Sequence, residues 1–132
     1  MSRVFLSHSP EETKKIAAQL SEELHGFIAL YGRMGVGKTA FAAGFIQARF
    51  PNVRVSSPTY TVMNCYSDEL YHLDLYRLSG EDDLESVGFY DIDSAATVLC
   101  ELPQRLPQGI VPDVCITMEL DSDGETRIIK VE

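Results

Sequence analysis

A glycine-rich segment flanked by apolar residues constrains the fold of this chain more than any other feature. Residues 32–39 read Gly-Arg-Met-Gly-Val-Gly-Lys-Thr, which satisfies the pattern G-x-x-x-x-G-K-[ST] at every defined position. The apolar run 27–31 precedes this segment, and Phe41, Phe45 and Ile46 follow it at helical spacing. A strand, a glycine-rich loop and a helix in this order are typical of a phosphate-binding loop, or P-loop. The segment therefore predicts an α/β fold that binds a phosphorylated ligand.

The residue types of this loop each suit one task in binding a nucleoside triphosphate. Gly32, Gly35 and Gly37 let the backbone wrap closely, so that consecutive N–H groups point at phosphate oxygens. Lys38 places a full positive charge at the β- and γ-phosphates, and Thr39 offers a hydroxyl to Mg²⁺. The helix that follows adds the positive end of its dipole. The sequence thus predicts a bound nucleotide with Mg²⁺.

A P-loop protein also needs a carboxylate at the end of a neighbouring strand to hold Mg²⁺, directly or through water. Glu101 ends the second fully apolar strand, and Asp74 shares one face of another predicted strand with His72. Both acids are candidates for this position. The alternatives are a surface acid at the strand end for Glu101, and an ion pair with Arg77 or Lys38 for Asp74.

The rest of the chain predicts a small P-loop domain over residues 1–132, with a largely parallel central sheet, flanking helices and antiparallel hairpins. Ser9, Pro10 and Glu12 mark the start of a helix that Gly26 stops. The further predicted elements are a short strand at 53–55, a hairpin of 62–66 with 70–76, an acidic helix at 80–87, a strand at 97–100, and a hairpin of 114–120 with 126–131.

Charge and cysteine content limit the partners and the compartment. The net charge is −9, and it is uneven: residues 1–78 hold 8 basic and 7 acidic side chains, whereas residues 79–132 hold 3 and 13. A chain with this negative charge is not expected to bind nucleic acid or an anionic membrane over a broad face. The acidic part is either a solvated surface or a face for a basic partner protein. Cys65, Cys100 and Cys115 fit no zinc spacing, and we expect reduced core thiols in a cytoplasmic protein without a signal peptide or membrane span.

Four segments together resemble the TsaE (YjeE-like) family, the bacterial ATPases of tRNA threonylcarbamoyladenosine biosynthesis. They are residues 32–39, the Ser-Pro-Thr-Tyr-Thr segment at 57–61, the His-Leu-Asp-Leu-Tyr-Arg-Leu segment at 72–78, and Cys100-Glu101. These segments occur in the family's order and span nearly the whole chain. Three positions depart from the usual family pattern, namely Leu102 in place of Trp, Arg33 in place of an acid, and Ala40 in place of Thr or Ser.

The resemblance implies a role for each of the four segments. Thr39 and Glu101 would hold Mg²⁺, residues 57–61 would form a switch loop near the γ-phosphate, and Asp74 would lie in the second active-site motif. The segment at Ser9-Pro10 would lie against the adenine. The resemblance also implies TsaB and TsaD as partners, with ATP hydrolysis resetting their complex and no transfer of the threonylcarbamoyl group by this chain.

We therefore expect a cytoplasmic Mg²⁺-dependent ATPase that turns over slowly alone and reaches tRNA through its partners. The alternatives are a small-molecule P-loop kinase and a nucleotide-sensing module that does not hydrolyse ATP. No arginine is plainly placed as a finger, although Arg33 and Arg77 could act in cis. The predicted catalytic residues are Lys38, Asp74, Glu101 and a switch-loop hydroxyl, Thr59 or Thr61, and the predicted nucleotide-binding residues are Ser9, Pro10, Gly32, Gly35, Val36, Gly37, Lys38, Thr39 and Ala40.

Overall fold

The computed structural model describes residues 2–33, 35–55, 63–75, 81–86, 88–107 and 109–132. Within them, α-helices, strands and short 3₁₀ helices alternate along the chain. None of these helices is long and apolar enough to cross a bilayer. The order is β1 (Arg3–Ser7), α1 (Pro10–Glu23), β2 (Phe27–Gly32), α2 (Lys38–Arg49), β3 (Met63–Ser67), β4 (Leu70–Asp74), α3 (Glu81–Ser86), η2 (Phe89–Asp91), β5 (Thr97–Glu101), η3 (Pro103–Arg105), β6 (Val114–Leu120) and β7 (Arg127–Val131).

The strands of the described residues form one sheet in the order β1-β7-β6-β2-β5-β4-β3. Its four central strands, β6, β2, β5 and β4, are parallel to one another. Antiparallel pairs of β1 with β7, β7 with β6, and β3 with β4 complete the two sides. The predicted parallel sheet with antiparallel hairpins is therefore confirmed. Because the central strands are parallel, their carboxyl ends meet at one edge, which is where ligands bind in open α/β sheets.

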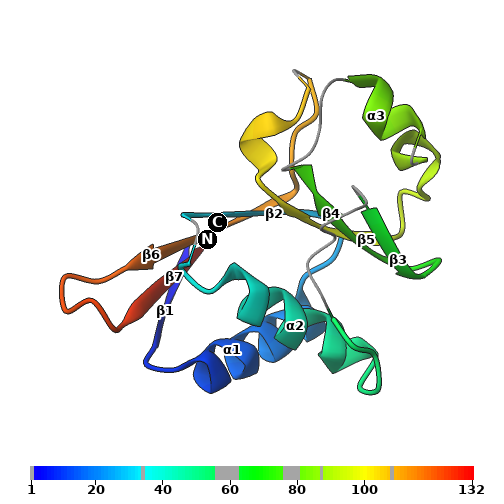
Figure 1. The fold of residues 1–132 in the computed structure, drawn as a ribbon. Helices are drawn as coiled ribbons and strands as arrows, with labels where there is room; N and C mark the ends of the chain where they lie inside the picture. Colours follow the sequence, from blue (N-terminus) through cyan, green and yellow to red (C-terminus); the bar gives the residue numbers. More distant parts are fainter. Residues whose placement is uncertain (1, 34, 56–62, 76–80, 87, 108) are drawn as a thin grey trace.

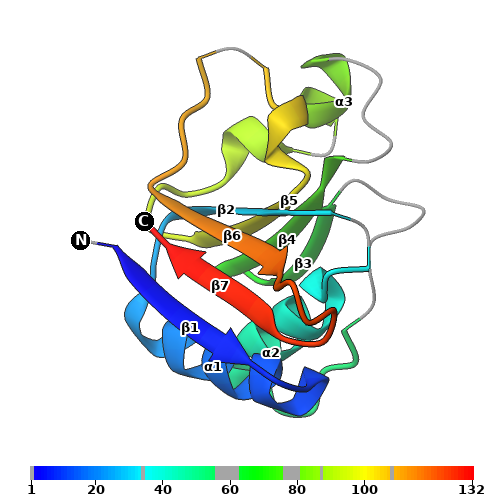
Figure 2. The same ribbon diagram turned by 90° about the vertical axis from the view of Figure 1, so that its left-hand side faces the viewer.

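Helices cover the two faces of the sheet in different ways. Helices α1 and α2 pack side by side on one face, and α3 with the short 3₁₀ helices lies over the other (Figure 1). Figure 2 shows the same two layers with β1, β7 and β6 turned toward the viewer. The larger core lies under α1 and α2, and its fully buried side chains include Leu20, Ile28, Leu30, Phe41, Phe45, Ile46, Leu70, Leu99 and Ile116.

Helix α1 begins at the residues that the sequence predicts. Ser9 is the N-cap, and its hydroxyl accepts a hydrogen bond of 3.1 Å from the N–H of Glu12. The Glu12 carboxylate reaches back to the N–H of His8 at 2.8 Å, one residue beyond the donor that a capping box normally uses. Two donors at the start of the helix are thereby satisfied, and Ser9 and Pro10 are fixed in place beside the sheet.

Helices α1 and α2 approach each other closely at Gly44. A Cβ atom at this position would lie 2.6 Å from Cα and 2.9 Å from the carbonyl carbon of Lys14, so only glycine fits. Further along, the half-buried guanidinium of Arg49 donates to the hydroxyl of Ser21 at 2.9 Å and to that of Thr97 at 3.0 Å. These contacts join α1 and α2 to β5. They fix the end of α2 that lies away from the loop.

Two predictions about the strands need correction. The strand predicted at 53–55 is absent, because the N–H of Val53 bonds to the carbonyl of Phe50 in a turn that leaves α2, and Val55 packs against the core without pairing. Strand β1 was not predicted. Its outward-facing Val4 and Leu6 are 62% and 56% exposed, so apolar residues on both faces hide the alternation that marks a strand.

The cysteines also differ from the prediction that all three lie in the core. All are free thiols, but only Cys100 is buried, while Cys115 is half-buried and Cys65 is exposed on the edge strand β3. Burial raises the pKa of the Cys100 thiol, which keeps it protonated and unreactive. The expectation of a core thiol is wrong for Cys65, because β3 lies at the end of the sheet formed by the described residues and part of its surface faces solvent.

Candidate functional site

The predicted phosphate-binding loop connects β2 to α2 at the carboxyl edge of the parallel strands. Gly35 and Gly37 have φ angles of +85° and +114°, in the left-handed region that disfavours residues with a Cβ atom. Gly37 is the N-cap of α2, no side chain caps the helix, and its first turn holds no acidic residue. The N–H groups of this turn are therefore not used by a side-chain cap, and the helix dipole favours an anion there.

Packing explains the first glycine of the loop and the path of its lysine. A Cβ atom at Gly32 would lie 2.8 Å from Cγ1 of Val36 and 3.2 Å from the carbonyl oxygen of Met118. The same atom would lie 3.4 Å from Cδ of Lys38, so the lysine side chain turns back across the loop. The motif predicts that the ammonium group of this side chain binds the β- and γ-phosphates.

The C-terminal hairpin supports the loop from the other side. Nε of Arg127, on β7, donates a hydrogen bond of 2.8 Å to the carbonyl of Val36, and its Nη1 donates to the carbonyl of Glu125 at 2.8 Å. Sequence reasoning missed this residue, because nothing local to Arg127 indicates a contact 91 residues away. Arg127 thus fixes one peptide unit of the loop and shares in the wall of the site.

A cavity of about 460 Å³ lies between the start of α1, the start of α2 and the turn from β6 to β7. It brings together predicted nucleotide-binding residues that are far apart in the sequence: Ser9 and Pro10 from one helix, and Val36, Gly37 and Ala40 from the loop and the next. Its further lining residues, which the sequence did not suggest, are His8, Thr13, Gly124, Glu125 and Arg127. The size and position of this cavity suit a nucleoside attached to a phosphate on the loop.

The turn that closes this cavity is ordered by one carboxylate. Asp123 accepts hydrogen bonds from the hydroxyl of Thr126 at 2.6 Å and from the N–H groups of Thr126 and Glu125, both at 2.8 Å. These bonds, the hydroxyl's first among them, lower the pKa of Asp123 to about 2. The turn is therefore held in one shape at neutral pH, with Gly124 and Glu125 beside the cavity.

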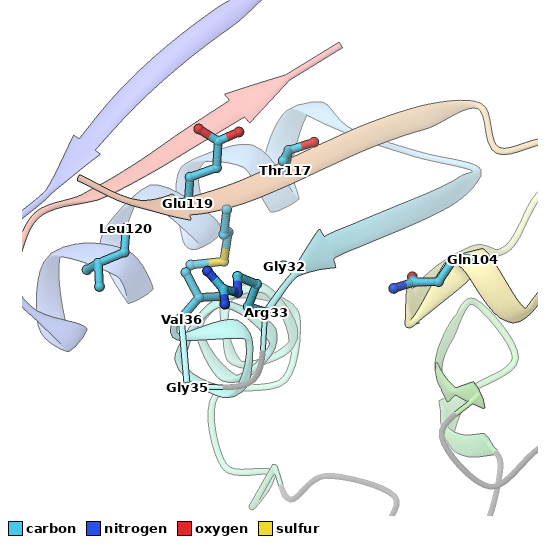
Figure 3. Close-up of a pocket in the computed structure, with 9 residues that line it drawn as sticks. Gly32, Arg33, Gly35, Val36, Gln104, Thr117, Glu119 and Leu120 are labelled. Carbon is cyan, nitrogen blue, oxygen red and sulfur yellow. The ribbon is translucent and has the colours of Figure 1, made fainter. Parts of the chain in front are cut away.

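A second cavity, of about 730 Å³, opens on the other side of the loop (Figure 3). Its wall is formed by the loop residues Gly32 to Val36 that the structure describes, by the end of β6, and by Gln104 of η3. Arg33 lines this cavity from the loop, and Glu119 of β6 lies across from it in Figure 3. Arg33, which departs from the family pattern, therefore lies on this side of the loop, away from Ser9 and Pro10.

Three polar side chains gather at the carboxyl ends of β4 and β5. In the parallel register Asp74 lies beside Glu101, and His72 lies beside Leu99 on the face that α2 covers. The imidazole of His72 and the carboxylate of Glu101 are buried, with an Nε2 to Oε2 distance of 2.6 Å. Only 6% of Glu101 is exposed, which excludes the alternative of a surface acid.

The donor types at this edge fit Mg²⁺. In register, Glu101 pairs with Leu30, two residues before the first glycine of the loop, and Thr39 lies exposed in the first turn of α2. Among the described residues, no group of three or more His, Cys, Asp and Glu side chains could hold a metal without further ligands. Mg²⁺ does not need such a group, because it takes one or two hard oxygen ligands from a protein and the rest from phosphate and water.

Some of the predicted residues fall outside the described part of the chain. They are the switch segment 57–61 with Thr59 and Thr61, and Arg77 of the second motif. Of the two ion pairs that were alternatives for Asp74, the structure therefore does not describe the one with Arg77. The roles assigned to Lys38, Thr39, Asp74 and Glu101 stay predictions.

A glycine-rich loop between a buried parallel strand and a helix, with an acid at the end of the adjacent strand, is the arrangement typical of the P-loop class of α/β folds. Within this class the chain belongs to the TsaE family. The family model described as "Threonylcarbamoyl adenosine biosynthesis protein TsaE" matches residues 7–129.

Individual relatives agree with this assignment. The tRNA threonylcarbamoyladenosine biosynthesis protein TsaE of Haemophilus influenzae is 31% identical over 120 residues, which cover 89% of this chain and 76% of that protein. The protein of the same name from Rickettsia bellii is 32% identical over 131 residues, covering 94% and 90%. The crystal structure of YdiB from Bacillus subtilis is 26% identical and superposes with a TM-score of 0.70, covering 99% of this chain and 84% of that one.

Proposed function

We propose that this protein is a Mg²⁺-dependent ATPase that acts in tRNA threonylcarbamoyladenosine biosynthesis. One observation carries the proposal: the uncapped, glycine-shaped start of α2 follows β2, and the parallel strand beside β2 ends at a buried carboxylate, Glu101, in a chain of the TsaE family. The relatives named above carry that biosynthetic pathway in their names. The cavity beside Ser9 and Pro10 supplies room for the adenosine.

In this proposal the loop contributes to catalysis mainly by stabilising the negative charge of the phosphates. Lys38 and the N–H groups of the loop bind the β- and γ-phosphates and offset the charge that builds on them in the transition state. Thr39 and Glu101 would hold Mg²⁺, which would neutralise negative charge on the phosphates. Asp74, or the hydroxyl of Thr61, orients the water. The water attacks the γ-phosphorus, the bond to the bridging oxygen breaks, and ADP and inorganic phosphate leave.

The arginines support slow turnover without partners. An arginine finger can raise phosphoryl-transfer rates by about 10³–10⁵. In the described residues, Arg49 is bound to α1 and β5, Arg127 is bound to the loop backbone, and Arg33 lines the cavity on the side of the loop away from Ser9 and Pro10. We therefore propose that TsaB and TsaD raise the ATPase rate, and that the chain, with its net charge of −9, reaches tRNA through them.

The test of the activity is ATP hydrolysis by the purified chain, with and without TsaB and TsaD, using γ-labelled ATP. The label should appear as free phosphate, and faster with the partners. Label on a small metabolite would identify a kinase, and ATP binding without any turnover would identify a sensing module. Tight, salt-sensitive binding of tRNA by the isolated chain would contradict the indirect route to tRNA.

Substitutions test the site itself. Lys38→Ala should weaken ATP binding by about 10- to 100-fold, the range that a charged hydrogen bond spans. Lys15→Ala, at an exposed position of α1, is the matched control and should bind ATP as the wild type does. Glu101→Gln should keep ATP binding but lose Mg²⁺-dependent hydrolysis, and unchanged hydrolysis would move the metal role to Asp74.

A further inference from the structure

The histidine of the second motif has no role in the function proposed above, yet it makes a short hydrogen bond to a residue of that site. His72 is 1% exposed, and its Nε2 lies 2.6 Å from Oε2 of Glu101. Both residues are fixed by the parallel pairing of β4 and β5. Among the residues whose side chains the structure describes, this is the only hydrogen bond to the Glu101 carboxylate. The contact therefore restricts the carboxylate at one oxygen and leaves the other oxygen, Oε1, without a donor from that part of the chain.

Stability does not explain a histidine at this position. Nδ1 of His72 is buried and has no hydrogen-bond partner in the described part of the chain. Such an atom costs free energy, and buried polar groups without a partner are rare in native proteins. Leu70 on β4 and Leu99 on β5 lie on the same face of the sheet as His72, and both are apolar and fully buried. An apolar side chain at position 72 would continue that pattern without an unsatisfied atom.

Hydrogen-bond chemistry assigns the direction of the contact. A carboxylate that binds a cation can only accept hydrogen bonds, so the proton of the contact is on Nε2 of His72. In the neutral imidazole Nδ1 would then be an unused acceptor, the less costly kind of orphaned group. In the described part of the chain, Nε2 is thus the one ring nitrogen of His72 that makes a hydrogen bond, and it faces Glu101.

We propose that His72 is a positioning residue for the Glu101 carboxylate: it holds Oε2 so that Oε1 is presented to the divalent cation. This inference rests on the proposed function, in which Glu101 is a ligand of Mg²⁺. Carboxylate ligands are commonly oriented by hydrogen bonds from a second layer of residues, and loss of such a bond costs about 10- to 100-fold in metal affinity or activity. His72 supplies this bond from the neighbouring strand.

The experiment measures cation affinity directly instead of turnover. Mn²⁺ is titrated into protein saturated with a non-hydrolysable ATP analogue, and free Mn²⁺ is read from its electron paramagnetic resonance signal. His72→Met removes the donor and keeps an apolar side chain of similar length. His72→Gln keeps an amide N–H about as far from the backbone as Nε2. Nucleotide affinity without metal and the thermal midpoint show whether each variant is folded.

We expect His72→Met to weaken Mn²⁺ binding about tenfold, while His72→Gln stays within about threefold of the wild type. In a Glu101→Gln background, His72→Met should have no further effect, because the two residues act through one contact. Equal losses in both backgrounds, or unchanged affinity in His72→Met, would overturn the proposal. If His72→Met does not fold, His72→Asn, whose shorter amide falls short of Oε2, takes its place in the same comparison.

The same titration separates this inference from the proposed function. If Glu101→Gln leaves Mn²⁺ affinity unchanged, Glu101 is not a metal ligand and the proposed site is wrong. If Glu101→Gln weakens Mn²⁺ binding and His72→Met does not, the metal site stands and only the positioning role of His72 fails.

Discussion

Because α1 and α2 approach each other closely at Gly44, we expect Gly44→Ala to lower stability, although helix propensity alone favours alanine over glycine. A Cβ atom at position 44 would lie 2.6 Å from Cα of Lys14, whereas carbon atoms in contact are about 3.5–4.0 Å apart. The obstacle is backbone, so Gly44→Ala must push the helices apart by about 1 Å. Overpacking of this kind costs about 3 kcal/mol, and the better helix propensity of alanine returns about 1 kcal/mol. We expect a net loss of about 2 kcal/mol, or about 8 °C in Tm.

The assay is chemical denaturation of wild type, Gly44→Ala and a matched control, Ala18→Gly. Ala18 lies half-buried in α1, so this control measures the helix-propensity difference between glycine and alanine, about 1 kcal/mol, together with the loss of one half-buried methyl group. Alanine should be preferred at position 18 and glycine at position 44. A Gly44→Ala protein as stable as the wild type would refute the reasoning, because the helix spacing would then not depend on this backbone contact.

Two further predictions concern the hairpin of β6 and β7. Arg127→Met removes the hydrogen bond to the carbonyl of Val36 and should weaken ATP binding about tenfold with the fold intact, as calorimetry and circular dichroism would show; unchanged affinity would mean that the loop needs no support from β7. Thr126→Val removes the hydroxyl that lowers the pKa of Asp123 to about 2, so this pKa should rise toward its ordinary value of 3.8 in an NMR titration. Since the folded pKa is depressed, the stabilisation is present above pH 3.8 and is lost as the pH falls toward 2, and the variant should lose less stability across that window. An unchanged pKa would assign the shift to the backbone N–H groups instead.

The parts of the fold that were predicted correctly are those with local signals. The loop pattern at 32–39, the cap at Ser9 and Pro10, and the continuous apolar strands β2 and β5 each lie within a short window of sequence. The alternation on β4 was also predicted correctly: Leu73 packs on the side of α3, and His72 on the other. In all these cases the residue pattern and the tertiary environment agree.

The parts that could not be predicted depend on contacts between distant segments. Strand β1 pairs with β7 at the far end of the chain, and its exposed Val4 and Leu6 blur the pattern that would reveal it. The hydrogen bond between His72 and Glu101 joins strands 29 residues apart. The motif drew attention to Asp74, and only the register of β4 with β5 shows that His72 is the residue in contact with the acid.

The support of the P-loop by the last strands has a consequence for the order of events during synthesis. The loop is complete in sequence once residue 39 has been made, but its neighbours Met118 and Arg127 are made last. The parallel pairing of β2 with β5 and β6 also waits for strands that are far along the chain, and such non-local pairing is slow to form. A nascent chain on the ribosome therefore carries the glycine-rich motif long before the loop has its native neighbours. The final hairpin completes the surroundings of the loop, so the site takes its folded shape only in chains whose sheet is fully assembled.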